Sequence, residues 1–204
     1  MIIIIINKEK SMKNWLYKNW AKFCIILSII ITLLIFIFVK TNNILFFLIW
    51  IQIPIYLLHQ FEEHYWPGGF KRFVNKEIFN VESGEYPLND VNIFWINVPI
   101  IWVLMPIFAS LSYINLFFGL WIPYFAVFNS LTHVVGAVVK RKYNPGLFVS
   151  LVLGIPVSAY TLWLFYTLIN VPLVITILSL FVVLLLHLVI IIPALRSFKH
   201  KNIN

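Results

Sequence analysis

Charged residues are scarce in this chain of 204 residues: Asp, Glu, Lys and Arg make up only 11% of it, whereas 62% of its residues are hydrophobic. Soluble globular proteins carry about 25% charged and roughly 45–50% apolar residues. A surface exposed to water cannot be built from this composition, which excludes an ordinary soluble domain. Cysteine is also nearly absent. The single Cys24 excludes an intrachain disulfide.

The sequence contains long apolar runs. Each is close to the roughly 20 residues that cross a ~30 Å hydrocarbon core as a helix. The runs are continuous rather than alternating, and in lipid only helices or closed barrels satisfy their own backbone groups. The sequence therefore predicts an all-α, polytopic membrane bundle of six transmembrane helices. The predicted spans are Phe23–Val39, Ile44–His59 or slightly beyond, Ile93–Ile114, Leu116–Val139, Leu147–Ile169 and Val171–Leu195.

The basic residues indicate how these spans are oriented. All of the 15 Lys and Arg except Lys40 fall in the tails and in alternate connections, and such an excess marks the cytoplasmic side. Both termini are then cytoplasmic, and the net charge of +8 reports topology rather than nucleic-acid binding. We expect a basic N-terminal segment (residues 1–22), a membrane domain (23–195) and a basic tail (196–204). Translation could equally begin at Met12, after the short apolar stretch 1–6.

Ionisable residues at membrane depth are costly, and they point to a function. Spans two, four and six run in the same direction, and their inner ends carry the polar side chains. Three elements distant in sequence thus present polar groups at one depth, near the cytoplasmic face. The residues are His59, Glu62 and Glu63 in span two, Asn129 and His133 in span four, and His187 in span six.

Helical spacing refines this picture. At 100° per residue, Glu62 falls about 60° to one side of His59 and Glu63 about 40° to the other, so one face presents all three. Asn129 and His133 are four residues apart and share a face of span four. His64 points about 140° away from His59 and receives a weaker role.

Imidazole and carboxylate groups together are a normal ligand set for zinc or non-haem iron, and helix bundles build such sites between facing helices. The predicted metal ligands are His59, Glu62, Glu63 and His133, with His187 as an additional ligand. Glu62, Glu63 and Asn129 are the predicted catalytic residues, with a carboxylate as general base and the amide orienting substrate or water. One or two divalent metals fit this set equally well.

Three segments carry a family resemblance. His59-Gln60-Phe61-Glu62-Glu63 resembles the signature of the HXXEE domain family of small bacterial membrane proteins. Asn129-Ser130-Leu131-Thr132-His133 is similar to that family's N-x-x-x-H motif, and Tyr143-Asn144-Pro145-Gly146 to its Y-x-P-G motif. The resemblance implies a bacterial cytoplasmic membrane protein with a candidate active site at His59, Glu62, Glu63, Asn129 and His133, and it implies nothing for His187.

Three functions remain open from the sequence. The first is a metal-dependent membrane enzyme, a hydrolase or an oxygenase, that acts on a lipidic or apolar substrate near the cytoplasmic leaflet. The second is a metal-free hydrolase in which glutamate and histidine activate water. The third is a metal or proton transporter. Membrane lipids are the expected partners in each case.

Overall fold

The computed structural model describes residues 2–39, 43–83 and 86–201, and these residues contain helices but no strand. This confirms the predicted all-α fold. Within these described ranges, five segments are long and apolar enough to cross a membrane by themselves. They are α3 (Ile44–His64), α5–η2–α6 (Asp90–Leu111), η3–α7 (Leu116–Lys140), α8–η4–α9 (Leu147–Leu168) and α10 (Leu173–Lys201).

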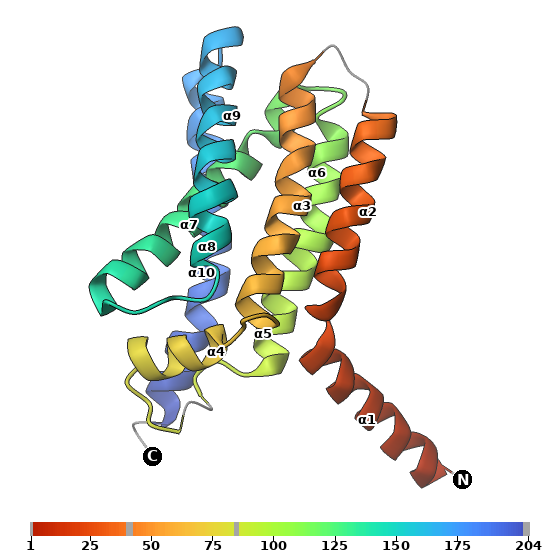
Figure 1. Ribbon diagram of the computed structural model, residues 1–204, viewed down its shortest axis with the longest axis vertical. Coiled ribbons are helices and arrows are strands. Elements are labelled where there is room, and N and C mark those ends of the chain that lie inside the picture. The colour runs from red at the N-terminus through yellow and green to blue at the C-terminus, as the bar shows by residue number, and fades with distance from the viewer. Residues whose placement is uncertain (1, 40–42, 84–85, 202–204) are drawn as a thin grey trace.

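A sixth span is formed only if two bent helices are counted together. Helix α2 (Lys22–Phe38) is 17 residues long, and it follows α1 (Ile2–Asn19) at a bend of 60°. Helix α2 packs closely along α3, whereas α1 leans away from the bundle (Figure 1). The predicted count of six therefore holds when this bent pair is one span.

Two of the spans contain a π-helical stretch. The segment α5 (Asp90–Asn97), η2 (Val98–Leu104) and α6 (Met105–Leu111) carries prolines at the start of both η2 and α6. In the other, α8 (Leu147–Val149) and η4 (Ser150–Gly154) precede α9 (Ile155–Leu168), which also begins with a proline. A proline removes one helical hydrogen bond and crowds the preceding turn, and a widened π turn accommodates it.

Helix α3 is the centre of the bundle. In its most apolar stretch 67% of the residues are buried, against 11% for α10, which lies at the periphery. Polar side chains on α3 bond to its neighbours: Gln52 accepts from Ser158 and donates to Thr161, and Gln60 donates to Asn97. Interhelical bonds of this kind hold membrane helices together. They fix α3 to α9 through Gln52 and to α5 through Gln60.

The start of α1 and the end of α10 lie on the same side of the bundle (Figure 1). That side also holds the short helices α4 (Phe70–Phe73) and η1 (Val74–Ile78), which connect α3 to α5. At the opposite end, η3 (Leu116–Gly119) leads into α7 (Trp121–Lys140).

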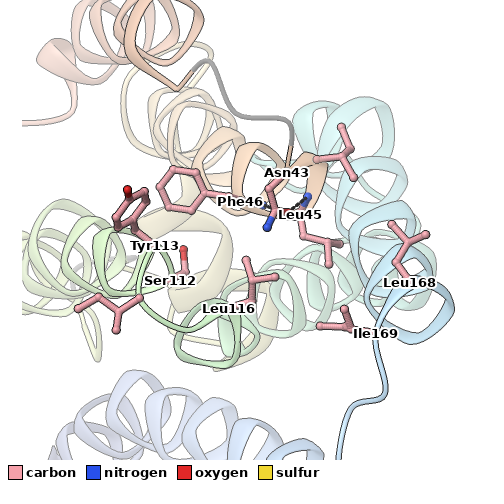
Figure 2. A pocket seen from close by; sticks show the side chains of 10 residues that line it. Asn43, Leu45, Phe46, Ser112, Tyr113, Leu116, Leu168 and Ile169 are labelled. Carbon is pink, nitrogen blue, oxygen red and sulfur yellow. Dashed lines mark hydrogen bonds between the residues drawn. The ribbon is translucent and has the colours of Figure 1, made fainter.

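A cavity of about 670 Å³ lies at that opposite end. Figure 2 shows side chains from the starts and ends of several spans around it, among them Asn43, Ser112, Tyr113 and Leu168. Among the described residues, Tyr113 is the only titratable one in its lining. The chemistry predicted from the sequence is therefore located elsewhere, about 20 Å further along α3.

Candidate metal centre

Three buried side chains from two helices converge near the end of α3. His59 and Glu63 lie one turn apart on α3, and His133 lies on α7; the three residues are 3%, 5% and 2% exposed. His133 Nε2 is 3.1 Å from Glu63 Oε1, and His59 Nε2 is 3.5 Å from Glu63 Oε2. One potential ligand atom from each residue lies within 4.8 Å of the other two. We call these three residues the His–Glu cluster.

Two neighbours fix the orientation of the His59 ring. The Asn129 amide Nδ2 lies 3.1 Å from His59 Nε2, and Ser150 Oγ lies 3.4 Å from His59 Nδ1. Because the amide nitrogen is a donor only, Nε2 accepts this bond, and the proton on Nδ1 then points to the serine oxygen. In this tautomer a metal bound at Nε2 would take the place of the Asn129 amide, while the other ring nitrogen is held by a hydrogen bond outside the centre.

Glu62 does not join the His–Glu cluster. Its Oε1 accepts hydrogen bonds from the Tyr143 hydroxyl at 2.5 Å and from the Phe148 amide at 2.9 Å, and its Oε2 accepts from the Val149 amide at 2.7 Å. A carboxylate at the start of a helix satisfies free amide groups and interacts favourably with the helix dipole. The structure thus places the carboxylate of this predicted ligand and catalytic residue at the start of α8, where it caps that helix. Burial, and to a smaller extent the hydrogen bond to Glu62, raises the pKa of the Tyr143 hydroxyl above its usual range.

Gly146 closes the turn that leads into α8, and its backbone lies directly against the cluster. A Cβ atom on this residue would come within 2.7 Å of His59 Cε1, 2.8 Å of His133 Cε1 and 2.9 Å of Glu63 Cγ. Its φ of +99° is also one that other residues rarely adopt. Asn144 of the same turn donates to the backbone carbonyl of His133. The sequence indicates only a turn at this point, whereas the structure shows that the turn packs against all three cluster residues.

The other two histidines of the membrane spans, His64 and His187, are half-buried and lie on different sides of the cluster. His64 Nε2 is 3.4 Å from Glu63 Oε2, so the structure brings this residue nearer than its position on the helical wheel suggests. His187 lies outside the cluster on α10, where its Nδ1 bonds to the Val183 carbonyl at 2.8 Å and its ring packs on Phe125. Its predicted role as an additional ligand has no geometric support here, because a different wall of the bundle holds it.

A small cavity of about 50 Å³ adjoins the cluster, and Glu63 and Asn129 are in its lining. A buried water needs a space of roughly this size with polar partners. Two imidazoles and one carboxylate with space beside them form a set that holds zinc in hydrolases or iron(II) in oxygenases, both of which keep positions open for substrate. His59, Glu63 and His133 are the residues that could hold a metal here.

These features define a class of protein: a polytopic helical membrane protein with a buried polar centre between two of its helices. A family model described as "Protein of unknown function with HXXEE motif" matches residues 50–161, which is more than half of the chain. The chain therefore belongs to the HXXEE family. No curated protein and no solved structure matches it.

Proposed function

We propose that the protein is a metal-dependent membrane enzyme that acts on a lipidic or apolar substrate. The observation that carries this proposal is the convergence of His59, Glu63 and His133 from two helices, with their ligand atoms within 4.8 Å of one another. A zinc ion held there would supply Lewis-acid activation of water, and an iron(II) ion would supply oxygen chemistry. We place the centre near the cytoplasmic leaflet of a bacterial membrane, with both termini inside, on the distribution of Lys and Arg.

The polar contacts of Glu63 support a cation at this place. Three imidazole Nε2 atoms lie within 3.5 Å of its carboxylate in the described part of the chain, those of His59, His64 and His133. His59 Nε2 accepts from the Asn129 amide and lies 3.5 Å from Glu63 Oε2, so no proton is shared between these two atoms. Imidazole nitrogen and carboxylate oxygen are both metal ligands, and these residues would hold a divalent cation if the Asn129 amide gave up its contact with His59.

In this proposal the residues around the cluster have separate tasks. Asn129 borders the small cavity and holds His59, so its amide is placed to orient a water molecule or a substrate oxygen there. Ser150 fixes the tautomer of His59 from outside. Glu62 and Tyr143 hold the start of α8, and with it Gly146, against the cluster.

A metal-free hydrolase is the second candidate, and one specific contact favours it. Glu63 Oε1 lies 3.1 Å from His133 Nε2, a hydrogen-bonding distance at which the pair could activate water by itself.

Elemental analysis of the purified protein tests the proposal, and the chain offers a matched pair of variants. We expect about one equivalent of zinc or iron in the wild type and its loss in Glu63→Gln. Glu62→Gln changes the adjacent carboxylate in the same way, and should keep the metal because Glu62 caps α8. Circular dichroism and gel filtration confirm that each variant is folded. A wild type that stays metal-free after incubation with either metal would contradict the proposal and favour the second candidate.

A further inference from the structure

A second, larger cavity lies beside the candidate metal centre. It has a volume of about 450 Å³ and is enclosed by α4, η1, α5, α7 and α10. Most of its lining is aliphatic or aromatic, as at Phe73, Ile93 and Ile190, and no Lys, Arg, Asp or Glu contributes to it among the described residues. An apolar cavity of this size falls within the range of small-molecule sites. It is suited to an uncharged apolar molecule.

The apolar cavity leads to the centre. Six residues line both it and the small cavity beside Glu63, so the two spaces adjoin. They are His64, Phe70, Ile96, Asn97, Asn129 and Ile190. A molecule in the larger space can therefore extend a group toward Glu63 and Asn129.

The apolar cavity also borders the surface that would face lipid. Ile78, Thr132 and Gly136 line both the cavity and a shallow apolar groove on the outer face of α7. Exposed apolar side chains such as Phe128 and Val135 form most of the rest of that groove, and Lys140 lies at its end. An apolar molecule can thus enter sideways from the bilayer, between η1 and α7, which favours a membrane lipid over a solute from the aqueous phase.

His187 supplies one polar group in the wall of this cavity. Its Nδ1 contacts the Val183 carbonyl oxygen, which can only accept, so Nδ1 carries the proton and Nε2 has a free lone pair. This Nε2 atom is buried and has no hydrogen-bond partner among the described residues. Leaving a buried acceptor unpaired is costly, and a ligand with an O–H or N–H group would pair with it.

From these observations we propose that the apolar cavity binds the hydrocarbon chain of a neutral membrane lipid, and that His187 accepts a hydrogen bond from a hydroxyl or amide N–H group on that chain. This inference rests on the proposed function because it names the substrate class of the same centre. It also gives His187 a role in recognition in place of metal binding.

Photo-crosslinking tests this proposal on the full-length protein in detergent micelles. The probe is a long-chain primary alcohol with a diazirine in mid-chain, and the comparison probe is its methyl ether, which accepts but cannot donate. We expect saturable labelling of peptides from α7 and α10 by the alcohol. Loss of one hydrogen bond should weaken labelling by the ether about fivefold.

Two matched variants on α10 test the location. Ala194→Phe fills the cavity, because Ala194 is buried in its wall. Val189→Phe adds the same ring at a position that is 54% exposed and outside the cavity lining. Saturable labelling should disappear in the first variant and remain in the second. Labelling that persists in Ala194→Phe would overturn the proposed location.

His187→Leu tests the recognition step. In this variant the alcohol and the ether should label equally, while labelling by the ether stays at its wild-type level. Equal labelling by both probes in the wild type would overturn the role of His187. Metal analysis of the same samples separates the two proposals: metal without saturable labelling overturns the chain-binding site alone, and labelling without metal overturns the metal centre alone.

Discussion

Gly146→Ala is the substitution for which the structure predicts the largest effect from the smallest change. One added methyl group would come within 2.9 Å of all three residues of the His–Glu cluster. Overpacking of this kind costs about 1–3 kcal/mol. The left-handed backbone at Gly146 adds about 1–2 kcal/mol for a residue with a Cβ. The free energy of unfolding should therefore fall by about 2–5 kcal/mol, and the ring positions that the metal needs should be lost.

Gly69→Ala is the matched control. Gly69 has nearly the same φ, +96°, but a Cβ there would meet only Pro145 Cγ at 3.9 Å, an ordinary contact. This variant should lose only the backbone contribution of about 1–2 kcal/mol. Thermal unfolding in detergent gives the comparison, and about 2–4 °C per kcal/mol is expected for a chain of this length.

Metal content measured on the same two variants completes this test. We expect Gly69→Ala to hold as much metal as the wild type and Gly146→Ala to hold little. If the two variants had equal melting temperatures and equal metal contents, the close packing of the turn against the cluster would be refuted.

Three further predictions follow from contacts around the centre. Tyr143→Phe removes one of the three hydrogen bonds on the carboxylate that caps α8, and should lower stability by about 1 kcal/mol in thermal unfolding without loss of metal. Ser150→Ala removes the partner of His59 Nδ1, and should weaken metal affinity at least about tenfold in a chelator competition assay; unchanged affinity would contradict this tautomer. The hydrogen bond from Lys142 lowers the pKa of Glu77, so their pairing stabilises the fold above the ordinary Glu pKa of 4.5 and is lost as the pH falls through the lowered value. We therefore expect the free energy of unfolding to change less between neutral and acidic pH in Lys142→Ala than in the wild type, with both measured at low salt.

The sequence predicted the membrane helices well because the hydrophobic runs are long and sharply bounded. The predicted span Phe23–Val39 differs from α2 by one residue at each end, and Leu116–Val139 differs from η3–α7 by one residue at one end. Helix α10 continues past the predicted Leu195 to Lys201, since a helix does not have to end where its apolar run ends. The π-helical stretches in two spans were not predicted, because hydrophobicity does not report local winding.

The sequence predicted that polar groups at the same depth on different spans come together, but it could not predict which of them form the cluster. Matching depth brought His59, Glu63 and His133 together as expected, because facing helices place groups of equal depth side by side. Helical spacing could not separate Glu62 from Glu63, since both lie within about 60° of His59. Only the positions of the neighbouring helices decide between them: α7 faces Glu63, and the start of α8 faces Glu62. For the same reason His187, at a matching depth, contributes to a cavity wall instead.

In this chain the two adjacent acids of the HXXEE motif have different partners. Glu63 supplies the carboxylate of the cluster, whereas Glu62 holds the start of α8. The residue before α8 is Gly146, which the third motif provides and which closes over the cluster, and Asn129 of the second motif orients His59.

Elsewhere in the bundle, polar side chains on α3 are paired with neutral partners, as Gln52 is with Ser158 and Thr161. In the His–Glu cluster, by contrast, the buried carboxylate of Glu63 lies within 3.5 Å of imidazole nitrogens of His59 and His133. A metal proposed at this point, where the three motifs meet, would give the buried carboxylate a cationic partner.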